Sequence, residues 1–312
     1  MNNPPSRSVN RSLIVRWTIT VLAVVLLVYL LSQQKWREII STVRTIPWEG
    51  FFLAVLFTLI SRLAVSGRWY VLLSSTGVKI TPWQSIRITF AGLFASNFLP
   101  TTVGGDVVRL GGTLLLKLDQ AVCLASLVVD RLVGMAGMAM ALPFMLPVVG
   151  KGFSDTPTSL IPSVFFLGNS IIPKQGWFQK FSEKVKFSIR RFLEAFKLWF
   201  WQPKALLKAL GFSWGHMLCL FISIWILLHG MNQDISFWLI AGLWSVTYFV
   251  TLLPISINGI GVQELIMAFM FTHFGGVSNA AGLSLALFIR VMQMIVSLPG
   301  AFFFPGMMVS NR

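Results

Sequence analysis

The chain has 312 residues, of which 55% are hydrophobic and 11% are charged, and its mean hydropathy is +0.77. Soluble domains carry roughly 25% charged residues, so this composition excludes an ordinary soluble protein and predicts an all-α protein that crosses a bilayer several times. The net charge of +15 comes from basic residues that flank apolar stretches, which favours anionic lipid headgroups over nucleic acid as partners.

Several apolar stretches approach or exceed the roughly 20 residues that a membrane-spanning helix requires. They lie near residues 12–31, 49–73, 121–150, 209–230 and 280–304, with two further pairs at 81–98 with 106–118 and 236–253 with 261–275. A weaker run at 158–172 is short for a span, so we expect about seven or eight transmembrane helices. Basic residues precede the first stretch, and no small-residue cleavage site follows it. We therefore expect an uncleaved first helix with a cytoplasmic N-terminus.

Each of the two pairs is interrupted by a proline followed by glycines. The first break contains Pro100 and the pair Gly104 and Gly105, and the second contains Pro254 and Gly261. Proline removes a backbone donor and glycine admits unusual backbone angles, so Pro100, Pro254 and Gly261 are expected to act as hinges. Broken backbone at membrane depth must be buried in protein or line a wet cavity. The breaks therefore predict two broken or re-entrant helix pairs beside a transport site.

The second half repeats the pattern of the first half, at an offset of 154 residues that separates Pro100 from Pro254. Both halves are predicted as a helix, a broken pair and a helix. We expect pseudo-repeats at 49–150 and 209–305 within a single integral membrane domain, residues 1–312. Whether the repeats are inverted depends on whether 158–172 crosses the membrane, which the sequence leaves open.

Residues 174–208 differ from the rest because they hold nine Lys or Arg and two Glu. Aromatic and aliphatic residues recur among them at three- and four-residue steps. This pattern predicts a basic amphipathic helix that lies in the cytoplasmic interface. We expect it to anchor the chain; the alternative is that it attracts anionic lipid toward the transport site.

Ionisable residues inside apolar sequence are the candidates for function, because each costs at least about 2.5–3.5 kcal/mol in hydrocarbon and tends to pair or to mark a pathway. Asp106 and Arg109 stand three residues apart after the first break. They predict either a helix cap with a local salt bridge, or a phosphate site formed by Arg109 and the amides of Gly104 and Gly105.

Glu264 follows the second break in a similar place. It can neutralise a cationic headgroup, carry a proton or pair with Arg290. Asp130 and Arg131 are adjacent, so on a helix they point to different sides, and we expect separate partners inside the bundle. Polar or glycine residues at the breaks that can satisfy freed backbone groups or contact a headgroup are Asn97, Thr101, Thr102, Ser256, Asn258 and Gly259.

No cofactor or metal is expected. The two cysteines, Cys123 and Cys219, lie in apolar runs, the three histidines lack metal-ligand spacing, and no phosphate-binding loop of the Gly-x-x-x-x-Gly-Lys type occurs.

In these motifs the chain resembles the lysylphosphatidylglycerol synthase transmembrane-region family, also called the flippase-like domain family, from about residue 50 to 305. The resemblance rests on Asn97-Phe98-Leu99-Pro100 leading to Gly104-Gly105-Asp106 and Arg109, on Asp130-Arg131, and on Pro254 to Gly261 leading to Glu264. Asp130 is one departure, since many relatives have Glu before the Arg; the charge is retained.

In bifunctional members of that family, the membrane region moves an aminoacylated lipid between leaflets and a soluble domain aminoacylates it. The sequence reaches Arg312 without such a domain. The resemblance therefore implies a stand-alone translocase of the bacterial inner membrane and not an enzyme. Its substrate would be a phospholipid or a polyprenyl-linked lipid whose anionic headgroup passes through a polar cleft.

Two alternatives remain. One is a membrane scaffold or accessory subunit for lipid-modifying or glycosyl-transferring enzymes of envelope or hopanoid biosynthesis. The other is a membrane-embedded transferase with Asp106 or Glu264 as a base, against which the missing donor-binding motif counts. A homo-oligomer or a separate transferase partner is compatible with the sequence.

Overall fold

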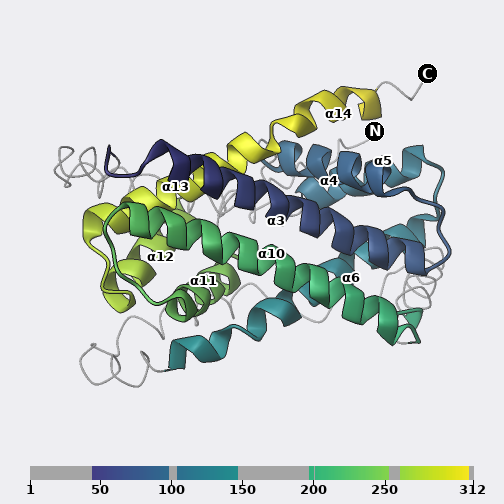
Figure 1. Cartoon of the computed structure of the whole chain (residues 1–312). Coiled ribbons are helices and arrows are strands. Elements are labelled where there is room, and N and C mark those ends of the chain that lie inside the picture. The colour runs from purple at the N-terminus through teal and green to yellow at the C-terminus, as the bar shows by residue number, and fades with distance from the viewer. Residues whose placement is uncertain (1–43, 98–103, 147–196, 200, 253–260, 309–312) are drawn as a thin grey trace, which may run out of the picture.

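The computed structural model describes residues 44–97, 104–146, 197–199, 201–252 and 261–308, and these parts of the chain fold into helices joined by short connections (Figure 1). The expected first helix at 12–31, the run at 158–172 and most of the basic segment 174–208 lie outside the described residues. So do the centres of both breaks, including Pro100, Pro254, Ser256, Asn258 and Gly259.

The first half of the described chain contains α3 (Trp48–Ser75), α4 (Pro82–Ser96), α5 (Gly104–Leu115), α6 (Gln120–Ala139) and the short 3-10 helix η1 (Leu142–Met145). The second half contains α10 (Pro203–Gly230), α11 (Phe237–Leu252), α12 (Val262–Phe269), the π-helical turn η4 (Met270–Phe274), α13 (Asn279–Ser297) and α14 (Pro299–Met308).

Among the described residues, four helical stretches are long and apolar enough to cross a membrane: Trp48–Ser75, Gln120–Met145, Pro203–Gly230 and Asn279–Phe303. The two 28-residue helices, α3 and α10, are each about 42 Å long at 1.5 Å per residue, which exceeds a hydrocarbon core of about 30 Å. The prediction of an all-helical, multi-pass membrane protein is confirmed.

Local signals in the sequence account for several helix starts. Thr81 and Gln84 form a reciprocal capping box at α4, with Pro82 in the first turn. The Asp119 carboxylate accepts hydrogen bonds from two backbone amides at the start of α6, and Ser278 caps α13 in the same manner. These caps define where the short connections end and the membrane helices begin.

Helices α3 and α10 lie side by side along their length and run in opposite directions (Figure 1). The start of α3 meets the end of α10, where the Ser223 hydroxyl donates to the Ala54 carbonyl at 3.0 Å. Near the other end, Gly67 of α3 leaves room for the ring of Phe212. Helices α6 and α13 pack against both members of this antiparallel pair.

The two halves have similar series of helix lengths. The first half has helices of 28, 15, 12 and 20 residues, and the second has helices of 28, 16, 8 and 19 residues. In each half a break outside the described residues separates the two short helices. The outer ends of α4 and α5 connect to the same end of the bundle, and those of α11 and α12 connect to the opposite end (Figure 1).

The last segment of each half also packs against a short helix of the other half. The continuation of α6, η1, packs on α11, and the continuation of α13, α14, packs on α4. Both contacts bring backbones close together at a glycine: Gly242 of α11 lies against the backbone of Met145, and Gly300 of α14 lies against the carbonyl of Phe90. A Cβ atom at either glycine would collide with backbone atoms of the other segment. The segments can therefore approach this closely only because glycine lacks a side chain.

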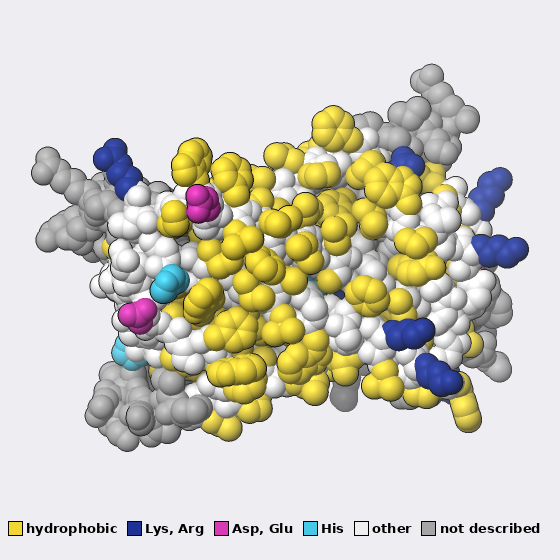
Figure 2. All heavy atoms as spheres, viewed as in Figure 1, with side chains coloured by type: hydrophobic (Ala, Val, Ile, Leu, Met, Phe, Trp, Pro, Cys, Tyr) yellow, Lys and Arg dark blue, Asp and Glu magenta, His cyan; other side chains and the backbone are white. Residues whose placement is uncertain are grey.

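Apolar side chains cover much of the surface in Figure 2, as expected for a protein surrounded by lipid tails. On α3 alone, Leu53, Leu56, Ile60 and Leu63 are exposed. Most Lys and Arg side chains on this face lie toward one end, while the acidic and histidine side chains lie toward the other end together with one basic side chain. The exposed lysines of the basic end include Lys79, Lys117, Lys204 and Lys208.

The close crossing of α4 and α5 at Gly92 yields a stability prediction. A Cβ atom at Gly92 would lie 2.7 Å from the Gly105 carbonyl oxygen, whereas one at Gly111 would meet nothing within 4 Å. Gly92→Ala should lower the free energy of unfolding by about 1–3 kcal/mol because it overpacks backbone against backbone. Gly111→Ala should raise it by about 0.5–1 kcal/mol because alanine favours the helix. Thermal unfolding in detergent, followed by tryptophan fluorescence, measures both, and equal shifts would contradict this crossing.

Candidate functional site

Five charged side chains from three helices meet in the first half of the bundle. They are Arg68 of α3, Asp106 and Arg109 of α5, and Asp130 and Arg131 of α6, and together we call them the charge cluster. Arg68 lies about 10 Å from the end of α3 at 1.5 Å per residue, which is well inside a span of 28 residues. The cluster therefore lies inside a helix that is long and apolar enough to cross a membrane.

Asp130 is the centre of the charge cluster, and its side chain is only 2% exposed. One carboxylate oxygen accepts a hydrogen bond from Arg68 Nε at 2.7 Å, and the other accepts one from Arg109 Nη1 at 3.2 Å. Arg68 Nη1 also donates to the Ser213 hydroxyl of α10 at 3.1 Å. A single buried carboxylate thus links α3, α5 and α6, and Arg68 extends this link to α10.

Asp106 forms the second half of the charge cluster, in the first turn of α5. Its carboxylate contacts Arg109 Nη1 at 3.3 Å, across one turn of the same helix, and Arg131 of α6 at 2.5 Å. Asp130 therefore pairs with Arg68 and Arg109, whereas Arg131 pairs with Asp106. Different partners are expected because adjacent residues on a helix point to different sides.

Arg109 has buried hydrogen-bond donors that no residue of the cluster uses. Both of its ion pairs use Nη1, while Nε and Nη2 are buried and have no hydrogen-bond partner. Its guanidinium lies over the Trp69 ring, 4.3 Å from the ring centroid, a favourable cation–π geometry. The Trp69 indole is itself fixed by donating to the Ser126 hydroxyl at 3.1 Å. The Arg109 guanidinium is thus rigidly held with two donors available.

The second half contains a matching acid–arginine pair. Glu264 of α12 is buried and forms a salt bridge with Arg290 of α13. Its other carboxylate oxygen accepts the backbone N–H of Gly261 at 2.8 Å. Gly261 has φ +78°, a left-handed conformation that favours glycine. Arg290 Nη2 is buried without a hydrogen-bond partner.

The two pairs occupy equivalent positions in their helices. Asp106 and Glu264 are the third residues of α5 and α12. Their partners, Arg131 and Arg290, are the twelfth residues of α6 and α13. Each half thus joins the short helix after its break to the following long helix by a carboxylate–guanidinium contact at matching positions. The first half adds a second such contact, between Arg109 and Asp130.

The remaining predicted site residues serve different contacts. The Asn97 side-chain amide donates to the Ser297 hydroxyl at 2.8 Å, which ties the end of α4 to the end of α13. Gly104 is buried, and Gly105 faces the backbone of Gly92. Positions Pro100, Thr101, Thr102, Pro254, Ser256, Asn258 and Gly259 lie outside the described residues.

Three further residues of this site have roles that sequence patterns did not reveal. Arg68 stands out as one of the arginines inside apolar sequence, but its pairing with Asp130 spans 62 positions. No sequence motif identifies Trp69, whose ring lies under Arg109, or Ser213, which accepts a hydrogen bond from Arg68. In the described part of the chain, no group of three or more His, Cys, Asp or Glu side chains is arranged to hold a metal ion.

At neutral pH the charge cluster has three guanidinium groups and two carboxylates, so it carries one excess positive charge. An uncompensated positive charge at membrane depth is costly. It is also what an anionic group would neutralise, and charge-assisted contacts between guanidinium and phosphate are among the stronger hydrogen bonds.

These observations define the class: a helical, multi-pass membrane protein with a carboxylate–guanidinium pair at the start of a short helix in each half. Within this class, the chain belongs to the lysylphosphatidylglycerol synthase transmembrane-region family, whose model matches residues 14–300. The resemblance seen in the sequence motifs is confirmed. A comparison with curated proteins finds no match.

Removal of the central carboxylate should be strongly destabilising. Asp130→Asn leaves Arg68 and Arg109 without their shared counterion, and breaking a buried pair in this way costs about 3–5 kcal/mol. Asp234 is exposed, so Asp234→Asn should change the free energy of unfolding by less than about 0.5 kcal/mol. Chemical unfolding in mixed micelles compares the two variants, and similar stabilities would refute the central role of Asp130.

Proposed function

We propose that this chain is a lipid translocase that receives an anionic, phosphate-bearing headgroup at the charge cluster. The observation that carries the proposal is Arg109, whose guanidinium is buried and fixed but leaves Nε and Nη2 without hydrogen-bond partners. A phosphate at this position would accept both donors and neutralise the excess positive charge.

The proposed path runs between the two halves. Asp106 and Asp130 orient Arg109. The Glu264–Arg290 pair, in the second half, would provide a second polar site for the headgroup along the path. Lipid tails would remain outside, along the apolar surface of α3. The substrate class is a phospholipid or a polyprenyl phosphate-type lipid, and the energy source would be the lipid gradient or an ion gradient.

The arrangement of the helices supports two re-entrant pairs in inverted repeats. Helices α3 and α10 hold equivalent places in the two halves and run antiparallel. The pairs α4–α5 and α11–α12 connect to opposite ends of the bundle. Broken pairs that face each other across a membrane are typical of transporters with inverted repeats. Pro100, Pro254 and Gly261 are the proposed hinges.

The distribution of charge supports an orientation in a bacterial inner membrane. Segments at the basic end expose Lys79, Lys117, Lys204 and Lys208 and one carboxylate, Asp119. The other end exposes Glu49 and Asp234 and one arginine, Arg44. By the positive-inside rule, the basic end would be cytoplasmic. The basic segment 174–208, which includes Lys204 and Lys208, would then lie on the cytoplasmic side.

Thiol accessibility tests this orientation. With Cys123 and Cys219 replaced by alanine, Asp234→Cys should react with a membrane-impermeant maleimide added to intact spheroplasts. Lys79→Cys should react only after the membrane is permeabilised. The reverse pattern would invert the proposed topology.

Reconstitution tests the translocase proposal directly. Purified protein in phosphatidylcholine–phosphatidylglycerol vesicles should make headgroup-labelled phosphatidylglycerol of the inner leaflet accessible to an outer-leaflet quencher. Arg109→Gln should slow this exchange about tenfold or more, because losing a charged hydrogen bond costs about 1.5–3 kcal/mol and 1.4 kcal/mol is tenfold.

The matched control is Arg87→Gln, because Arg87 is an exposed arginine of α4 outside the charge cluster. It should translocate like the wild type. Circular dichroism and gel filtration confirm that each variant is folded. If folded Arg109→Gln/Glu264→Gln translocates as fast as the wild type, the site assignment is wrong. If the wild type moves none of the lipids tested, the membrane-scaffold interpretation takes its place.

A further inference from the structure

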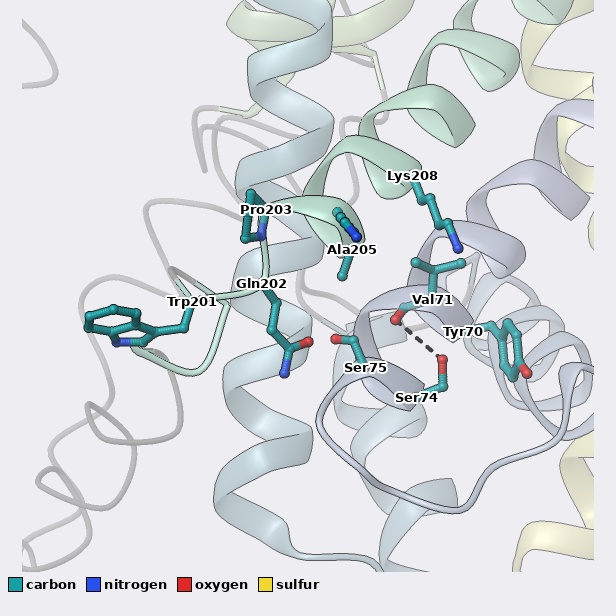
Figure 3. A pocket seen from close by; sticks show the side chains of 10 residues that line it. Tyr70, Val71, Ser74, Ser75, Trp201, Gln202, Pro203, Ala205 and Lys208 are labelled. Carbon is teal, nitrogen blue, oxygen red and sulfur yellow. Dashed lines mark hydrogen bonds between the residues drawn. The ribbon is translucent and has the colours of Figure 1, made fainter.

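A cavity of about 650 Å³ lies at the basic end of the bundle, between the last turns of α3 and the first turns of α10. Its lining, drawn in Figure 3, consists of Tyr70, Val71, Ser74, Ser75, Trp201, Gln202, Pro203, Lys204, Ala205 and Lys208. It is separate from the charge cluster, whose five residues do not line it. We propose that this cavity binds the phosphate headgroup of an anionic phospholipid from the adjacent leaflet.

The charge of the cavity favours an anion. Lys204 and Lys208 are the charged residues among those that line it, and neither has a carboxylate partner in the described part of the chain. In Figure 3 the Lys208 side chain extends from α10 toward Val71, and Gln202 points toward Ser75. The Ser74 and Ser75 hydroxyls already donate to carbonyls of α3. The donors left for a phosphate therefore include the two ammonium groups and the Gln202 side-chain amide.

The wall of the cavity is fixed to the bundle. Trp199 is 2% exposed, and its indole N–H donates to the Leu72 carbonyl at 3.0 Å, near the end of α3. This anchor holds the segment before α10 against α3 and so keeps Trp201 and Gln202 at the rim. A preformed cavity loses less conformational entropy on binding than lysines on a loose chain would.

The position of the cavity favours a lipid over a soluble anion. Because α3 and α10 have 28 residues each, their terminal turns extend beyond a hydrocarbon core of about 30 Å, at the level of the headgroups. Trp201 at the rim is 87% exposed, and Leu207, near the start of α10, is 67% exposed. An exposed tryptophan is typical of the membrane interface. The apolar surface around Leu207 would receive the acyl chains.

The test is lipid binding to the full chain in detergent, measured by native mass spectrometry during titration with dioleoyl-phosphatidylglycerol. Two basic residues near a membrane surface contribute about 1 kcal/mol each. Lys204→Gln/Lys208→Gln should therefore weaken binding of one phosphatidylglycerol about 25-fold, since 1.4 kcal/mol corresponds to tenfold. The matched control, Lys79→Gln/Lys117→Gln, removes the same charge from the same end outside the cavity and should bind like the wild type.

Equal affinities in the two double variants would overturn the proposal, as would equal binding of dioleoyl-phosphatidylcholine by the wild type. Displacement of the lipid by an equal concentration of inorganic phosphate would also overturn it, because the site would then select a free anion. Folded Arg109→Gln should keep this binding. If the Lys204→Gln/Lys208→Gln variant binds phosphatidylglycerol as well as the wild type does, the cavity proposal alone fails. If the wild type translocates no lipid, the translocase proposal alone fails.

Discussion

Buried charges need counterions, and in this molecule the ion pairs that meet this need join helices that are separate in the chain. Asp130 sits between Arg68 and Arg109, so it joins α3, α5 and α6 through one carboxylate. The short helix α5 has only 12 residues and cannot span a bilayer alone. Its Asp106 and Arg109 attach it to the long helix α6. The same solution recurs in the second half, where Glu264 attaches α12 to α13 through Arg290. The polar interior and the architecture thus have a common physical origin.

Much of this arrangement follows from sequence patterns that act over short distances. Hydropathy predicts the four long spans found in the described part of the chain. Proline and glycine predict the breaks, and the three-residue spacing of Asp106 and Arg109 predicts that both lie on one face of α5. The pairing of Glu264 with Arg290 was one of three options that the sequence allowed. The partners of Asp130 could not be deduced, because Arg68 and Arg109 lie on other helices and only the packing brings them together. Trp69, which lies under Arg109, belongs to an apolar run in which nothing distinguishes it from a core residue.

The two polar regions differ in how their charges are held. In the charge cluster, the guanidinium groups of Arg68 and Arg109 are buried and paired, so each of these charges is held by a specific geometry. At the basic end, the lysines border an open cavity at the headgroup level and keep contact with water. Buried arginine suits a fixed, directional contact with phosphate, whereas interfacial lysine supplies a compact and mobile charge. The chain therefore uses the two basic residue types at different depths.

The exchanged contacts between the halves bear on how the chain assembles during synthesis. Asn97 at the end of α4 pairs with Ser297, a partner 200 residues later in the chain, and α14 packs on α4 beyond it. Until α13 and α14 have entered the membrane, the α4–α5 pair lacks the packing that α14 provides. The Phe90 carbonyl is then not yet covered by Gly300. The α4–α5 pair must therefore wait, incompletely packed, through the synthesis of the second half. Insertion can proceed helix by helix, but completion of the first half depends on the second.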